Sequence, residues 1–199
     1  MGKSRLEAFS DGVLAIIITI MVLELKVPHG ETLASLRPLA PVFSSYVLSF
    51  VYIGIYWNNH HHMLHTLRAV TGPMLWANLH LLFWLSLLPF TTGWMGENHF
   101  APGPSALYGF VLLMAGAAYW TLQQVIIAAQ GPGSVLKKAV GRDWKGKMSP
   151  FLYAVAIATT LWSTWIAQAI YVVVALIWLV PDRRIEHALA AEEGAADSR

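Results

Sequence analysis

Five long stretches of the chain are almost entirely apolar, and proline and glycine residues separate them. They cover residues 9–27, 42–57, 74–94, 104–130 and 150–180. Runs of this length with few charges are typical of transmembrane helices, which need about 20 apolar residues to cross the hydrocarbon core. Proline just inside a helix and glycine or proline just after its end mark the boundaries. The pattern predicts an all-α integral membrane protein.

The last apolar stretch is too long for one span. As a single helix, its roughly 31 residues would measure ~46 Å, whereas the hydrocarbon core is ~30 Å thick. A break near Trp162-Ser163-Thr164-Trp165 would divide it into two short helices. We therefore expect six transmembrane helices per chain within residues 1–184, followed by a short cytoplasmic tail, 185–199.

The positions of lysine and arginine agree with six spans. Eleven of the 13 would lie on one side, and only Lys26 and Arg37 on the other. Because positive residues stay cytoplasmic, both termini should face the cytoplasm of a multi-pass cell-membrane protein. A five-span topology would place Arg183 and Arg184 outside and weaken this asymmetry. The eleven are Lys3, Arg5, Arg68, Lys137, Lys138, Arg142, Lys145, Lys147, Arg183, Arg184 and Arg199.

Composition supports the membrane assignment. Of 199 residues, 56% are hydrophobic and 12% charged, and the mean hydropathy is +0.53, whereas a soluble domain carries about 25% charged residues. The absence of cysteine excludes disulfides, thiolate nucleophiles and cysteine-ligated metals. A net charge of +2 gives no reason to expect a nucleic-acid partner.

The first apolar stretch begins with unusual polar residues. Ser4 and Glu7 have the spacing of a capping box, which predicts a helix that begins near Ser4 and contains Asp11. A charged aspartate costs about 2.5–3.5 kcal/mol at the centre of a span and less near its end, so it needs partners from neighbouring helices. In the alternative interpretation, Ser10 and Asp11 form an N-cap at the membrane interface.

This segment resembles a known family. Residues Arg5 to Gly12 resemble the R-x-x-x-F-S-D signature (Arg5, Phe9, Ser10, Asp11) that opens the first span of the transmembrane protein 175 family, potassium channels of lysosomes and bacteria. Further resemblances follow in the same order along the chain: Trp57-Asn58-Asn59-His60-His61, Trp76-Ala77-Asn78, Leu88-Pro89-Phe90, and Leu179-Val180-Pro181-Asp182-Arg183-Arg184.

The resemblance implies a passive, potassium-permeable channel without a cofactor. Its pore would lie on the symmetry axis of a homotetramer and be formed by the first helix of each subunit. The family's constriction corresponds to Ile16, followed by Ile20 and Leu23 on the same face and bordered by Thr19. On periodicity alone these residues are more typical of packing or lipid contact. An apolar ring can gate by dewetting, and the chain has no TVGYG-like filter loop.

A histidine cluster is the densest group of polar residues. His61 and His65 are four positions apart, a spacing that can hold a metal on one helix face. The alternative function is therefore a membrane enzyme that binds a metal or haem through residues 60–65. The resemblance instead implies that Trp57, His61 and Asn78 support the signature residues through hydrogen bonds, while the choice among His60, His61 and His62 stays open.

Overall fold

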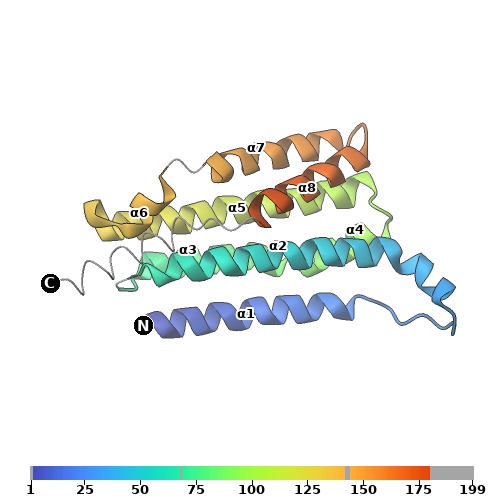
Figure 1. The fold of residues 1–199 in the computed structure, drawn as a ribbon, viewed down its shortest axis with the longest axis horizontal. Helices are drawn as coiled ribbons and strands as arrows, with labels where there is room; N and C mark the ends of the chain where they lie inside the picture. Colours follow the sequence, from blue (N-terminus) through green and yellow to red (C-terminus); the bar gives the residue numbers. More distant parts are fainter. Residues whose placement is uncertain (1, 68, 142–143, 180–199) are drawn as a thin grey trace.

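The computed structural model describes residues 2–67, 69–141 and 144–179, and these residues form helices and their connections. The helices lie side by side, and consecutive long helices run in opposite directions, with α1 at one edge and α7 with α8 at the opposite edge (Figure 1). The elements are α1 (Lys3–Leu23), η1 (Leu33–Leu39), α2 (Ala40–His65), α3 (Gly72–Ser86), α4 (Leu88–Glu97), α5 (Pro102–Gln130), η2 (Gly131–Gly133), α6 (Val135–Val140), α7 (Trp144–Thr159) and α8 (Thr164–Leu179).

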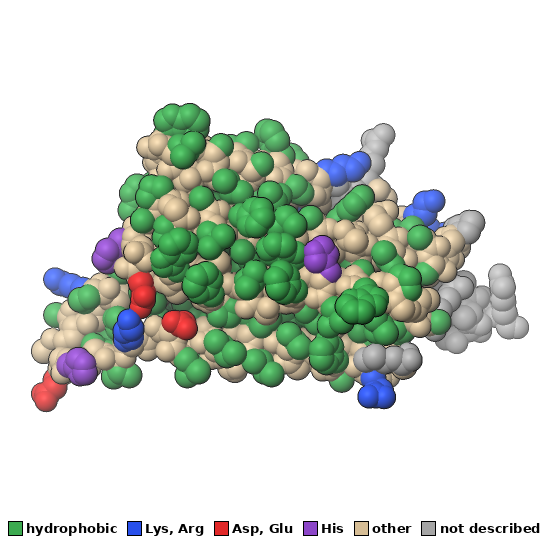
Figure 2. Space-filling view, turned by 180° about the vertical axis from the view of Figure 1, so that it is seen from behind, with side chains coloured by type: hydrophobic (Ala, Val, Ile, Leu, Met, Phe, Trp, Pro, Cys, Tyr) green, Lys and Arg blue, Asp and Glu red, His purple; other side chains and the backbone are tan. Residues whose placement is uncertain are grey.

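Two ends of the bundle can be distinguished. The beginning of α1, the α2–α3 connection and α6 lie at one end, which we call the N-terminal end (Figure 1). The α1–α2, α4–α5 and α7–α8 connections lie at the other, which we call the distal end. On the face shown in Figure 2, hydrophobic side chains cover the middle, and charged side chains lie toward the two ends. This distribution suits a protein whose middle is surrounded by lipid.

Within the described part of the chain, four helical segments are long and apolar enough to cross a membrane: Lys3–Leu23, Leu33–His65, Gly72–Glu97 and Pro102–Gln130. The third consists of α3 and α4, which meet near Pro89. Proline has no backbone N–H, so the bond that residue 89 would donate to the Leu85 carbonyl is missing and the helix is interrupted. α5 ends at Gly131, where φ is +68°, a conformation that glycine adopts without steric cost.

The predicted break in the last apolar stretch is confirmed. α7 ends at Thr159 and α8 begins at Thr164. In the connection, the N–H groups of Trp162 and Ser163 both donate to the carbonyl of Thr159, at 3.0 and 2.8 Å. α7 and α8 pack against each other as an antiparallel pair (Figure 1). The tail 185–199 and the Val180–Arg184 part of the exit motif lie outside the described residues.

The predicted helix, which begins near Ser4 and contains Asp11, is present, but Ser4 and Glu7 do not form the predicted capping box. α1 begins at Lys3 with Gly2 as its N-cap and without a side-chain capping bond, so Ser4 lies inside the helix. Glu7 is 3.9 Å from Lys3 Nζ in an i,i+4 ion pair. Lys3 Nζ also donates to the His65 carbonyl at 2.7 Å, which ties the start of α1 to the end of α2. Because α1 already includes Lys3, this side chain can contact both Glu7 and the His65 carbonyl.

Candidate functional site

α1 contacts the rest of the chain through one narrow stripe. Its buried residues recur every three or four positions, on the face toward α2, α3 and α4. They are Leu6, Ser10, Leu14, Ile17 and Met21. Most of the remaining circumference is exposed, because α1 lies at the edge of the bundle (Figure 1).

The residues expected to form the constriction lie on this uncovered part of α1. Ile16, Ile20 and Leu23 are 58%, 43% and 78% exposed. Thr19 is also exposed, and its hydroxyl donates to the Ile16 carbonyl at 2.9 Å, which leaves its oxygen lone pairs available as acceptors. A band of apolar side chains with one hydroxyl at its border is therefore available to lipid, to water or to another subunit.

A fully buried hydrogen-bond chain joins α1, α2 and α3. His60 Nε2 on α2 lies 2.7 Å from Asn78 Oδ1 on α3. Asn78 Nδ2 donates to Ser10 Oγ on α1 at 3.0 Å, and Ser10 Oγ donates to the Leu6 carbonyl at 2.9 Å. All three side chains are at most 1% exposed. In an apolar environment such a chain fixes both the position and the rotation of α1, because any other rotation would leave buried polar atoms without partners.

Asp11 has a partner on α2, as the sequence predicts. Trp57 Nε1 donates to Asp11 Oδ1 at 3.1 Å. Asp11 therefore lies inside α1 and is not the N-cap of a helix. The other signature residues, Arg5 and Phe9, are exposed, and Arg5 forms no side-chain hydrogen bond or ion pair with a described residue.

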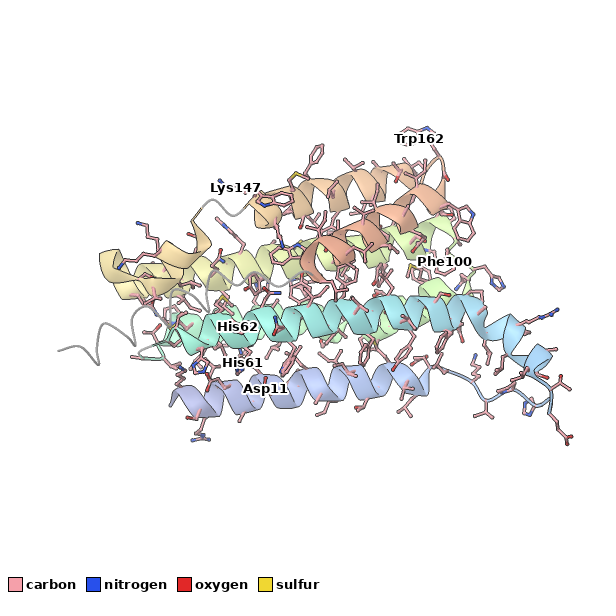
Figure 3. All side chains as sticks on the ribbon, in the orientation of Figure 1. Asp11, His61, His62, Phe100, Lys147 and Trp162 are labelled. Carbon is pink, nitrogen blue, oxygen red and sulfur yellow. The ribbon has the colours of Figure 1, made fainter. Side chains whose placement is uncertain are left out.

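His60, and not the expected His61, is the histidine in the buried chain. Neighbouring residues on a helix point about 100° apart, so only one of the consecutive histidines can face Asn78. His61 is exposed, and its ring lies among those of Trp57, His62 and His65, at 6.3, 5.7 and 5.4 Å between centroids. Figure 3 shows Asp11, His61 and His62 toward the same end of the α1–α2 pair.

The geometry does not favour a metal site in the histidine cluster. Among the described residues, no three His, Asp or Glu side chains converge into a group that could hold a metal ion. The ring of His60 is instead bonded to Asn78, and the ring nitrogen Nδ1 of His65 lies 3.3 Å from Lys3 Nζ. Two of the clustered histidines, His60 and His65, thus contact other side chains of the chain in place of a metal ion.

Sequence reasoning missed a contact at the distal end. Lys26, just beyond α1, donates to Glu97 Oε1 at the end of α4, at 2.6 Å. This hydrogen bond and the charge of Glu97 raise the pKa of Lys26. The sequence shows opposite charges at the ends of two apolar stretches, but it does not show that these two ends lie together in the fold.

Comparison with known proteins agrees with the signature on α1. The model of the endosomal/lysosomal potassium channel TMEM175 family matches residues 5–89. A potassium channel of Chryseobacterium sp. strain P1-3 is 57% identical over 189 residues, 95% of this chain and 98% of that protein. The chain belongs to the TMEM175 family. The matched TMEM175 region contains the whole buried chain from Ser10 to Asn78.

Two further TMEM175 relatives extend the comparison. The crystal structure of a lysosomal potassium-selective channel TMEM175 homologue from Chamaesiphon minutus has a TM-score of 0.80 and 27% sequence identity, over 90% of this chain and 97% of that one. The endosomal/lysosomal proton channel TMEM175 of Bos taurus is 35% identical over 101 residues, 45% of this chain and 21% of that protein. These relatives and the matched fold are channels and not enzymes.

Proposed function

We propose that this TMEM175 chain is one subunit of a homotetrameric, potassium-permeable channel of the cell membrane, with a pore lined by α1 of each subunit. The observation that carries the proposal is the uncovered face of α1, with Ile16, Ile20 and Leu23 exposed on a helix whose opposite stripe is fixed in the protomer. The potassium channel from Chryseobacterium and the potassium-selective homologue from Chamaesiphon support the choice of ion.

Charge placement supports the orientation. The N-terminal end carries Lys3, Arg5, Lys137, Lys138, Lys145 and Lys147, whereas the distal end carries Lys26 and Arg37. Positive residues remain on the cytoplasmic side, so the N-terminal end faces the cytoplasm. α7 and α8 are 16 residues each, or about 24 Å at ~1.5 Å per residue. They cross as the fifth and sixth spans, which returns the chain to the cytoplasmic side.

The proposed mechanism follows from the chemistry of the lining residues. Four Ile16 side chains around an axis offer no oxygen to a passing ion. Potassium therefore keeps much of its hydration shell at the constriction, and loss of water from the apolar ring closes the path. Thr19 lies three positions along, and four of its hydroxyl oxygens would be the nearest polar contacts. This arrangement discriminates less sharply between potassium and sodium than a filter of carbonyl oxygens.

The buried chain positions the pore helix in this proposal. Asn78 and His60 hold Ser10 inward, and Trp57 holds Asp11 one residue further along. Ile16 is six positions after Ser10, which corresponds to about 120° around the helix axis at ~100° per residue. Fixing Ser10 against α3 therefore turns Ile16 away from its own protomer and toward the axis.

Purified protein in liposomes tests the proposal. The protein should pass potassium along its gradient without ATP, and Ile16→Asn should raise the flux severalfold and move the reversal potential under a potassium/sodium gradient toward zero. Val22→Asn is the matched control. Val22 is also an exposed apolar residue of α1, at 44%, but it points about 120° away from Ile16. Wild-type flux no greater than that of empty vesicles, with insertion verified, would refute the channel. Equal effects of the two variants would refute the constriction.

A further inference from the structure

Two adjoining hollows lie between α2, α5, α7 and α8, on the side of the protomer away from α1. The inner hollow, of about 60 Å³, is lined mainly by the aromatic side chains Tyr52, Tyr56, Tyr119, Tyr153 and Trp178. The outer hollow, of about 490 Å³, includes Gln124 and Lys147. Gly116, Trp120, Gln123, Gly146 and Pro150 line both, so the two form one continuous site.

Gln123 is the unusual residue of this site. It is 5% exposed, yet its amide forms no hydrogen bond with any described residue. Among the described side chains, no fully enclosed nitrogen or oxygen lacks a partner, so the Gln123 amide opens into the hollows that it lines. A polar group buried among aromatic rings is costly without a partner. The site is therefore shaped for a ligand that carries a hydrogen-bonding group at this depth.

The charge of the site indicates the kind of ligand. Lys147 lines the outer hollow and is exposed near the start of α7 (Figure 3). No aspartate or glutamate is among the described residues that line either hollow. Tyr153 follows Lys147 by six positions, so it lies about 9 Å further along α7, toward the middle of the apolar belt. The site thus passes from a positive charge, through an amide, to an aromatic interior.

We propose that this site binds an anionic phospholipid such as phosphatidylglycerol. The phosphate lies in the outer hollow near Lys147, the Gln123 amide donates to a phosphate or ester oxygen, and the first few methylene groups of one acyl chain occupy the inner hollow. The order of charge, amide and apolar wall along the helix axis matches the order of groups in a lipid that stands along the membrane normal. The inference does not depend on the proposed pore, because every residue of the site lies outside α1.

Native mass spectrometry of the purified protein, supplied with phosphatidylglycerol or phosphatidylcholine of identical acyl chains, tests this site. Phosphatidylglycerol should be retained about fivefold better, because one lysine favours a lipid with a net negative charge, whereas the choline of phosphatidylcholine offsets its phosphate. Lys147→Gln should remove that preference, while Lys138→Gln, at the same end but outside the hollows, should keep it. Gly116→Leu should reduce retention of both lipids, because the new side chain fills the hollow, whereas Gly103→Leu, at the start of α5 and outside the hollows, should not.

Gln123→Leu separates a ligand-binding role from a structural one. Because the Gln123 amide forms no hydrogen bond with any described residue, the variant loses none. Its unfolding midpoint in lipid-free detergent should therefore be no lower than that of the wild type. Its phosphatidylglycerol retention should fall about tenfold, the effect of losing a hydrogen bond to a charged group. Equal retention of both lipids by the wild type would overturn the proposal. The proposal would also be overturned if the Gln123→Leu variant retained as much phosphatidylglycerol as the wild type, or if the Lys147→Gln variant kept the headgroup preference.

Discussion

Replacing Asn78 tests the buried chain that holds α1. Asn78→Leu keeps a side chain of similar size but removes the hydrogen bonds to His60 and Ser10, at 2.7 and 3.0 Å. Interhelical hydrogen bonds in membranes contribute about 0.6 kcal/mol on average and up to ~1.7 kcal/mol. His60, at 1% exposed, is left with a buried nitrogen that costs about 1–3 kcal/mol when unpaired. Because these costs overlap, the free energy of unfolding should fall by roughly 2–4 kcal/mol.

Unfolding by SDS titration, followed by tryptophan fluorescence at one protein concentration, measures this loss. Asn58→Leu is the matched control, since Asn58 on α2 is only partly buried and forms no side-chain hydrogen bond with the described residues. Ser10→Ala should cost less than Asn78→Leu, because it removes one interhelical hydrogen bond instead of two, although it leaves Asn78 Nδ2 without its acceptor. In a double-mutant cycle, the two changes should be non-additive by at least about 0.5 kcal/mol. Additive effects, or a loss for Asn78→Leu no greater than for Asn58→Leu, would refute the reasoning.

Two further predictions concern the packing of α1 and of α4. Asp11→Ala should lower the yield of the proposed tetramer, measured by cross-linking and size exclusion, because Trp57 loses its acceptor and α1 loses a restraint. An unchanged tetramer fraction would contradict the proposed role of Asp11. Gly96→Ala should lower the free energy of unfolding by about 1–3 kcal/mol, because the new methyl group would lie 2.7 Å from Val42 Cα. Gly103→Ala, where nothing lies within 4 Å, is its control, and an equal effect at both glycines would disprove a close contact of α2 with α4.

The sequence was sufficient for several ends of the apolar helices, because these boundaries are local. Pro89 interrupts the third apolar segment through its own missing N–H group, and Gly131 ends α5 through its own positive φ. The break before Thr164 agrees with the length of the last apolar stretch, but length alone does not dictate it, because α5 runs unbroken for 29 residues. The breaks at Pro89 and Gly131 depend on a few neighbouring residues.

The contacts between helices were harder to predict from the sequence. Asp11 was expected to have partners on neighbouring helices, and Trp57 provides one. The choice of His60 over His61 depends on the rotation of α2 relative to Asn78, which is 18 positions further along the chain. The inner hollow combines residues from four helices. Nothing in the sequence of α5 alone indicates that Gln123 is buried while Gln124 is exposed.

The two faces of α1 explain why its polar residues say more about the orientation of the helix than its apolar residues do. Lipid, a neighbouring subunit and an apolar constriction all accept isoleucine, so Ile16 and Ile17 have indistinguishable sequence environments although one is 58% and the other 4% exposed. Ser10 and Asp11 tolerate few surroundings, because each must find a hydrogen-bond partner in a medium without water. Once Asn78 and Trp57 meet that need, the rotation of the whole helix is set. The orientation of Ile16 is therefore encoded by residues that do not touch it.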